Sequence, residues 1–118
     1  MEKIFDRGNV LASACPSRKI LQHLTSRWGA LVLVTLNSGT KRFSELRRAI
    51  DGVSERMLTK TLQELEADGM LIRKSYNTVP PQVDYTLTEF GSQASNKMSE
   101  LVDWLETNLN DILVSQQK

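Results

Sequence analysis

The sequence predicts a mainly α-helical fold with one small β-hairpin and a long helix at the C-terminal end. Three observations predict it. Apolar residues recur at helical spacing through most of the chain, two short strand-like segments flank a Pro-Pro pair, and the C-terminal segment keeps one apolar stripe. A chain of 118 residues, with 40% hydrophobic and 25% charged residues, can bury one core. A single domain is therefore expected.

The residue counts exclude several classes of protein. One cysteine, Cys15, cannot form a disulfide within the chain, and one histidine, His23, leaves too few ligands for a Cys/His zinc site. The longest apolar run, residues 30–34, is far shorter than the roughly 20 residues that cross a bilayer. Residues 1–6 lack the apolar run of a secretory signal. We expect a soluble, cytoplasmic protein with no metal, no cofactor and no membrane partner.

Charge is divided unevenly along the chain, although the net charge is only +1. Residues 16–60 sum to +6 and residues 61–118 to −5. A basic half beside an acidic half favours a surface that faces a polyanion such as double-stranded DNA. Charge alone fits an uneven scatter of solvated side chains equally well.

The first third of the chain is predicted to hold an arm and one or two helices. Residues 1–14 are expected to form an arm or short helix, anchored by Ile4, Phe5, Val10 and Leu11. Pro16 and Ser17 can open a helix, because a proline loses no hydrogen bond in the first turn. The apolar segment from Trp28 to Leu36 is rich in valine and fits either a buried strand or a buried helix.

Two further helices are separated by a short glycine-containing turn. Phe43, Leu46 and Ile50 mark one helix face, and residues 51–53 form the turn. Ser54 is a good N-cap for the second helix, which ends near Asp68. The buried face of this second helix is predicted to consist of Leu58, Leu62 and Leu65. Such a pair of helices is the helix-turn-helix pattern.

A β-hairpin and a long helix complete the chain. Residues 70–76 and 82–87 are predicted strands, and a β-hairpin directly after a helix-turn-helix makes a winged helix. Thr88 can cap the final helix, whose apolar stripe exceeds what one small domain needs to cover. We expect a second copy of the chain to cover this stripe. The predicted dimer interface consists of Met98, Leu101, Trp104, Leu105, Leu109 and Ile112.

Six short motifs follow one another along the chain. They are Cys15-Pro16, Arg27-Trp28, RFSELRR at 42–48, GVSERML at 52–58, LQELEADG at 62–69 and VPPQVDYTLTEFG at 79–91. With these motifs the sequence resembles the HxlR-type group of winged helix-turn-helix transcriptional regulators, which are relatives of the MarR-type regulators. The resemblance covers residues 15–91 closely and the final helix loosely.

The resemblance implies a homodimeric, DNA-binding regulator of bacterial type, associated with the nucleoid. It implies an N-terminal arm (1–14), a winged helix-turn-helix domain (15–91) and a C-terminal dimerisation helix (92–118), with residues 28–36 helical. Ser26 and Arg27 stand where many members have Gly-Gly-Lys before the tryptophan. Gln82 is neutral where many members carry a base, so the wing tip is expected to contribute less phosphate contact.

The helix that begins at Ser54 is expected to read DNA bases. Burial of its leucines turns the opposite face outward, and the N-terminal part of a recognition helix usually reaches the base edges. Arg56 can pair with a guanine, and Thr59 can touch a thymine methyl group. The predicted base contacts are Ser54, Arg56, Thr59 and Lys60. Outside this motif the same residues would fit a solvated helix face.

Phosphate contacts are expected on both sides of the recognition helix. The helix before the turn usually crosses the DNA backbone, so Arg47 and Arg48, with Lys41 or Arg42, are predicted phosphate ligands. Alternatively, one of these two arginines pairs with Glu45 or Asp51 on the surface. In the wing, phosphate or minor-groove contacts are predicted for Arg73, Lys74 and Asn77.

Cys15 is the candidate regulatory thiol. It precedes Pro16 at a helix start, where the helix dipole and the nearby Arg18 and Lys19 are expected to lower the thiol pKa. Several regulators that resemble this chain sense quinones, aldehydes or oxidants through a cysteine at this position, which implies a small electrophile or other inducer. The alternative is a small residue that fills space at the dimer interface.

His23 is not expected to serve as a catalytic base. It follows Cys15 by eight residues, a separation of roughly 12 Å along a helix, which is too far for a Cys–His dyad. It is expected to be an exposed or interface histidine, and the protein is not expected to be an enzyme.

The sequence therefore predicts a sequence-specific transcriptional regulator that binds an inverted repeat as a homodimer. Repression is expected rather than activation, with Cys15 as a candidate redox or electrophile sensor. The alternative function is a winged-helix protein-interaction module without specific DNA binding.

Overall fold

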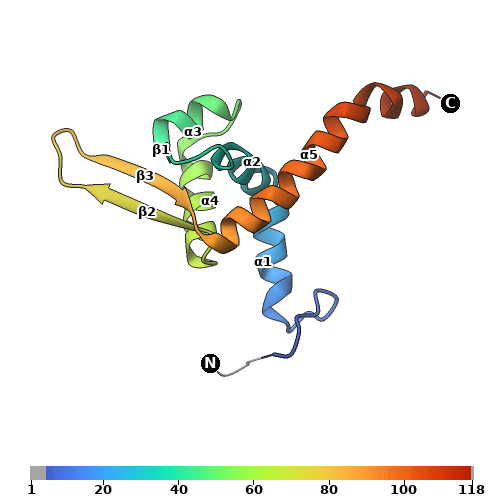
Figure 1. Cartoon of the computed structure of the whole chain (residues 1–118), viewed down its shortest axis with the longest axis horizontal. Coiled ribbons are helices and arrows are strands. Elements are labelled where there is room, and N and C mark those ends of the chain that lie inside the picture. The colour runs from blue at the N-terminus through green and yellow to red at the C-terminus, as the bar shows by residue number, and fades with distance from the viewer. Residues whose placement is uncertain (1–4, 118) are drawn as a thin grey trace.

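The computed structural model describes residues 5–117, so Ile4, one of the expected anchors, lies outside the described residues. These described residues form five helices and three short strands. Their order is α1 (Pro16–Thr25), α2 (Arg27–Leu36), β1 (Lys41–Arg42), α3 (Phe43–Ala49), α4 (Glu55–Ala67), β2 (Leu71–Tyr76), β3 (Gln82–Leu87) and α5 (Glu89–Ser115). The β2–β3 hairpin and the C-terminal half of α5 project from the body in different directions (Figure 1).

The core forms where α2, α3 and α4 meet the base of the sheet. The apolar face predicted for α4 is confirmed, since Leu58, Leu62 and Leu65 are buried, and Thr61 extends it. The buried core consists of Val32, Leu36, Leu46, Ile50, Val53, Leu58, Leu62, Leu65, Leu71 and Tyr85. The arrangement leaves the opposite face of α4 open to solvent.

The segment after Trp28 is a helix, so the alternative of a buried strand is wrong. The Ser26 side chain caps this helix by accepting the backbone N–H of Gly29 at 3.2 Å. Val32, Leu33 and Leu36 are then buried on one side of α2, which packs between α4 and α5. The apolar run alone fits a strand or a helix, and the local cap together with burial against neighbouring helices decides for the helix.

The sheet has three strands rather than the two that were predicted. The hairpin pairs β2 with β3 antiparallel, from Leu71 opposite Leu87 to Tyr76 opposite Gln82. The two-residue strand β1 adds to the other edge of β3, giving the order β1-β3-β2. Two residues are too few to show the alternating pattern of a strand, so the sequence gives no local sign of β1. The strand is defined only by its pairing with β3.

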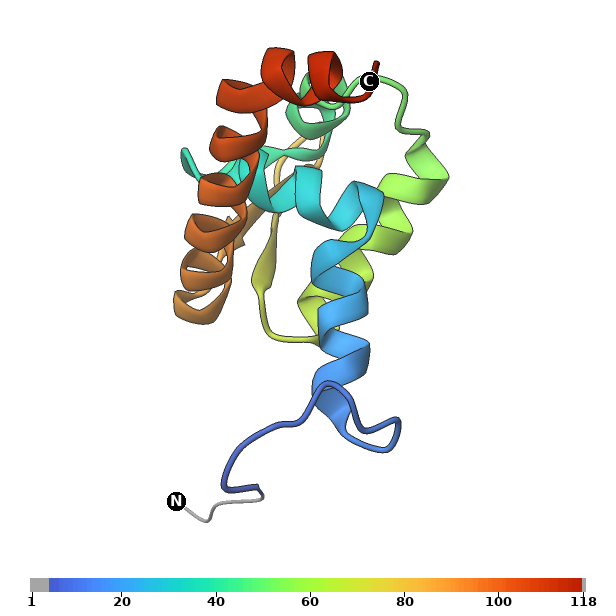
Figure 2. The ribbon, with the colours of Figure 1, turned by 90° about the vertical axis from the view of Figure 1, so that its right-hand side faces the viewer.

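The long helix α5 begins next to the C-terminal end of α4. Its own C-terminal half extends away from the body of the molecule. Thr88 caps α5 by accepting the N–H of Gly91 at 3.0 Å, and the Thr88 hydroxyl donates to the carbonyl of Gly69 at 2.6 Å. Its 27 residues give a helix of roughly 40 Å. Figure 2 shows α5 crossing α2 and continuing beyond it. Within residues 5–117, no helix combines the length and hydropathy needed to cross a membrane.

Candidate nucleic-acid interface

The turn between α3 and α4 orients the start of α4 outward. Gly52 has a φ of +86°, a conformation that favours glycine, and the chain reverses there. The Ser54 hydroxyl then accepts the N–H of Met57 at 3.1 Å, which caps the first turn of α4. The side chain of Ser54, predicted to touch a base, is therefore engaged as a helix cap.

The outward face of α4 is exposed along its whole length. Arg56, Thr59 and Lys60 lie on it and are solvent-exposed, and Ser54 is exposed at the N-cap just before it. Gln63 continues the same face one turn beyond Thr59 and is also exposed. Uncharged polar and basic side chains thus alternate on a free helix face, as base-edge recognition requires.

The two predicted phosphate ligands of α3 are exposed, and one of them has an acidic neighbour. The Arg47 guanidinium contacts the Glu55 carboxylate at 2.9 Å, so its partner is neither Glu45 nor Asp51. Both side chains are at least half exposed, so this pair adds little stability and can open. Glu45 instead accepts the backbone N–H of Arg42 at 2.9 Å and caps α3. Arg48 is exposed at the end of α3.

A groove of about 530 Å³ separates α4 from the wing, the β2–β3 hairpin. Thr59 and Gln63 line one wall, and Arg73 lines the other. Glu66 adds a negative charge at the same groove. The fold therefore brings a predicted base-reading residue and a predicted wing base, far apart in sequence, to one groove.

The wing places its two predicted bases on opposite faces. Arg73 pairs in register with the buried Tyr85, on the face towards α4. Lys74 pairs with Asp84 on the other face, because successive strand residues alternate. The Lys74 ammonium lies 5.0 Å from the centre of the Tyr76 ring, a cation–π contact within the wing.

The remaining predicted contacts lie near the base and tip of the wing. Lys41 and Arg42 form β1, where Arg42 pairs in register with Asp84. Arg42 also lines a groove of about 590 Å³ that runs from the start of α3 to the wing tip. Asn77 is exposed at the start of that tip. Gln82 donates to Asp84 at 3.2 Å rather than pointing to solvent.

Cys15 lies at the N-cap of α1, wrapped by the preceding loop. Its Sγ accepts the backbone N–H of Asn9 at 3.3 Å and lies 3.0 Å from the Ser17 hydroxyl. The hydrogen bond from Asn9, then that from Ser17, lowers the pKa of the Cys15 thiol, as predicted in direction. The nearby Arg18 guanidinium donates instead to the carbonyls of Val10 and Leu11 and so holds the loop.

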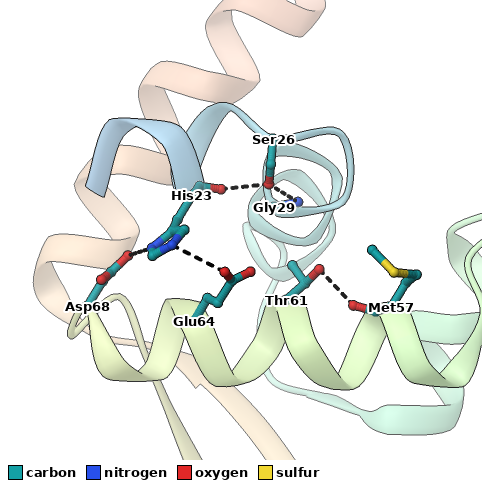
Figure 3. A network of polar contacts seen from close by, with 7 residues as sticks. All are labelled: His23, Ser26, Gly29, Met57, Thr61, Glu64 and Asp68. Carbon is teal, nitrogen blue, oxygen red and sulfur yellow. Dashed lines mark hydrogen bonds and ion pairs between the residues drawn. The ribbon is translucent and has the colours of Figure 1, made fainter. Parts of the chain in front are cut away.

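His23 is not exposed, so the first of its two expected environments is wrong. Its side chain is 13% exposed and lies between two carboxylates of α4. Nδ1 is 2.6 Å from Asp68, and Nε2 is 3.2 Å from Glu64 (Figure 3). Both nitrogens are therefore turned to α4. No cluster of three His, Cys, Asp or Glu side chains suited to a metal occurs in residues 5–117.

The apolar stripe of α5 is largely uncovered in the single chain. Trp104 is 57% exposed, and Leu101, Leu105 and Leu109 are each at least 45% exposed. Met98 and Ile112 are half-buried, and Leu113 and Val114 extend the exposed stripe. A groove of about 280 Å³ continues it across to Leu21 and Leu24 of α1.

The capped outward helix, the arginines of α3 and the wing define a winged helix-turn-helix transcriptional regulator with a DNA-binding fold. The family model described as HxlR-like helix-turn-helix matches residues 23–112, and the chain belongs to that family.

Named relatives agree with this assignment. The HTH-type transcriptional regulator YtfH of Escherichia coli K12, itself uncharacterized, is 57% identical over 106 residues, 90% of this chain and 84% of the relative. The structure of a protein described as a transcriptional regulator, ytfH from Salmonella typhimurium, is 54% identical with a TM-score of 0.90, covering 95% of this chain and all of the other. The redox regulator HypR in its reduced form is 39% identical with a TM-score of 0.74, covering 85% and 98%.

Two features of the interface were missed by sequence reasoning. No role was predicted for Gln63, although its position four residues after Thr59 places it on the same face of the helix. The contact of His23 with α4 could not be anticipated. Glu64 and Asp68 are spaced as neighbours on a helix, but nothing in the sequence says that α1 crosses there.

Proposed function

We propose that this chain is a homodimeric, sequence-specific regulator that binds an inverted repeat in double-stranded DNA and represses transcription by occupying it. The observation that carries the proposal is the free N-terminal end of α4, with Arg56 exposed and Thr59 facing the groove beside Arg73. It acts in the cytoplasm, on nucleoid DNA.

The proposed contacts divide into two kinds. Base reading is assigned to Arg56, Thr59 and Lys60, with Ser54 holding the helix end. Phosphate contacts hold the protein on the duplex without reading sequence, and they are assigned to Lys41, Arg42, Arg47, Arg48, Arg73, Lys74 and Asn77. Lys74 can contact a phosphate only if the face of the wing that points away from α4 lies against the DNA backbone.

Dimerisation is proposed through the α5 stripe. Two α4 helices must lie about 34–36 Å apart to enter successive major grooves on one side of the duplex. A second copy packed on Leu101, Trp104, Leu105 and Leu109 removes apolar surface from water and relates the two reading surfaces by a two-fold axis.

Cys15 is proposed as the sensing residue for an oxidant or small electrophile. The lowered thiol pKa favours the reactive thiolate. The thiol also accepts a hydrogen bond from Asn9. Modification of the sulfur removes that bond and so weakens the attachment of the loop to α1, which the Arg18 guanidinium also holds. As Cys15 is the sole cysteine, a disulfide would join two chains or a small thiol.

The first experiment is selection of bound sequences from random duplex DNA by the purified protein, with and without a thiol-reactive quinone. We expect an enriched inverted repeat that is lost after quinone treatment. A repeat unaffected by quinone would remove Cys15 from sensing while leaving DNA binding. Absence of any enriched sequence at low salt would favour a winged-helix module that binds another protein.

Two arginine variants separate base reading from phosphate contact. Arg56→Ala should cost about 1–3 kcal/mol on the selected site and relax preference at one base position. Arg48→Ala should weaken binding to all sequences alike and reduce the log–log salt slope by about 0.9. Affinities are measured on the selected site, on single-base variants and over a salt series. Identical behaviour of both variants would show that α4 is not the reading helix.

A further inference from the structure

His23 joins three helices at one point. Its backbone carbonyl accepts the Ser26 hydroxyl at 2.9 Å, and the same hydroxyl caps α2 through Gly29. A side chain at Gly29 would collide with that carbonyl, so the last turn of α1 and the first turn of α2 meet as closely as backbones can. Figure 3 shows the imidazole crossing from this corner to α4.

The side chain of His23 holds the C-terminal end of α4. Nδ1 donates to Asp68 Oδ2 at 2.6 Å, and Nε2 faces Glu64 Oε2 at 3.2 Å. A carboxylate can only accept, so the hydrogen of the shorter contact belongs to His23. Asp68 is 13% exposed like His23, so this contact is shielded from water more than the surface pair Arg47–Glu55.

The contact matters because α1 has few other attachments to the reading surface. No residue of α1 is fully buried. Leu24 packs at the edge of the core, and Leu21 faces the apolar groove shared with α5. His23 is therefore the polar link between the helix that borders the exposed stripe and the helix proposed to read DNA.

Asp68 also adjoins the start of α5. The next residues, Gly69 and Met70, accept hydrogen bonds from the Thr88 hydroxyl at 2.6 Å and the Thr88 N–H at 3.0 Å. The C-terminal end of α4 is thus tied to α1 through His23 and to α5 through Thr88. Its N-terminal end projects freely towards the proposed DNA.

Small rotations at this junction have large effects at the reading end. The 13 residues of α4 span roughly 20 Å. A tilt of roughly 10° about the C-terminal end moves the N-terminal end by about 3.4 Å, which is the rise of one base pair. In a two-fold dimer such a movement changes the distance between the two recognition helices.

We propose that His23 is a positioning residue for DNA recognition. Its contacts with Asp68 and Glu64 lock α4 to α1, and this lock determines which spacing between half-sites the dimer accepts. The inference rests on the proposed function, because it requires a dimer that reads an inverted repeat.

The test measures affinity for a series of duplexes in which the spacer between the selected half-sites is shortened or lengthened by one and two base pairs. The unaltered protein should bind one spacer best. His23→Leu should keep its affinity for a single half-site, and its discrimination between the best and the neighbouring spacer should fall at least about fivefold. Gln22→Leu, at an exposed neighbouring position on α1, is the matched control and should discriminate like the unaltered protein.

A second variant tests the same contact from α4. Asp68→Asn removes the carboxylate charge at nearly constant shape and leaves a neutral oxygen as a weaker acceptor, so it should lose part of the discrimination in the same direction. The double variant His23→Leu/Asp68→Asn should be no worse than His23→Leu, because that change already removes the contact that Asp68→Asn weakens. His23→Gln, which retains N–H donors, should recover part of the discrimination.

The outcomes separate the inference from the proposed function. Unchanged spacer discrimination in His23→Leu and Asp68→Asn would overturn the role of His23 and leave the regulator intact. Failure of the unaltered protein to prefer any inverted repeat would overturn the proposed function, and the positioning role with it. Should His23→Leu fail to fold, the Asp68→Asn series decides alone.

Discussion

At the residue scale, the environment of Cys15 shows how a short loop can activate a thiol. The N–H of Asn9 and the Ser17 hydroxyl both approach Sγ, and a negatively charged sulfur accepts such bonds better than a neutral one. These two bonds lower the pKa of Cys15, while burial opposes them weakly. Arg18, which the sequence suggested as the activating charge, instead keeps the loop in place.

The pH dependence of alkylation tests this account. Because the thiolate is the nucleophile, the alkylation rate should rise with pH and level off at a lower pH than for a cysteine in a flexible peptide. Ser17→Ala removes one stabilising bond, so its profile should shift towards higher pH. Ser13→Ala, an exposed neighbour, should leave the profile unchanged. Iodoacetamide rates over a pH series provide the measurement, and a profile equal to that of the peptide would refute the lowered pKa.

At the element scale, Ser54 has a structural role that can be separated from DNA contact. Its hydroxyl caps α4 through Met57. Ser54→Ala should therefore lower the free energy of unfolding by about 1 kcal/mol. Ser54→Asp keeps an acceptor for the cap and places a negative charge near the proposed DNA. Denaturant unfolding should show nearly unchanged stability for Ser54→Asp, and titration with the selected site should show weakened binding.

One outcome for these variants would contradict the capping role of Ser54, and another would contradict its position near the DNA. Equal losses of stability would mean that the hydroxyl, rather than any acceptor, is needed at the cap. Undiminished DNA binding by Ser54→Asp would place the start of α4 away from the phosphates.

The junction of α4, β2 and α5 depends on a close backbone approach at Gly91. A β-carbon there would overlap the carbonyl of Met70, and neither backbone can yield without shifting an element. Gly91→Ala should lower the free energy of unfolding by about 1–3 kcal/mol, although alanine is the better helix former. Ser92→Ala, exposed in the same turn, is the control. Stability of Gly91→Ala equal to that of the unaltered chain would show that α5 can move away without cost.

Elements with a strong local pattern could be predicted, and those defined by distant partners could not. Leu58, Leu62 and Leu65 identify the buried face of α4 by spacing alone. Strand β1 has two residues and exists only because β3 lies beside it, so no local signal marks it. The same reason hides the contact of His23 with Asp68, which lies 45 residues away. For the candidate interface, spacing predicted the outward face of α4, whereas only the packing of the hairpin shows that Arg73, and not Lys74, lies on the side of α4.

At the scale of the whole molecule, the proposed DNA-reading surface and the apolar stripe of α5 occupy separate regions. The wing projects from one side of the body, with α4 beside its base, and α5 extends from another side (Figure 1). The basic segment of residues 16–60 and the acidic segment that follows match this division in part. Such separation lets a second chain cover α5 without obstructing α4.

Disruption of the α5 stripe should therefore abolish cooperative DNA binding without unfolding the chain. Leu105 is 45% exposed in the single chain, so Leu105→Glu removes no buried core contact and places a charge in the proposed interface. Sedimentation should show a monomer with unchanged helical content. Two half-sites bound by separate monomers lose the advantage of linkage, so affinity for the full repeat should fall by about 100-fold or more. Thr107→Glu adds the same charge on the opposite face of α5 and should stay dimeric with full affinity. A Leu105→Glu protein that remains dimeric would move the interface elsewhere, and a monomer that retains full affinity would show that one copy reads the operator alone.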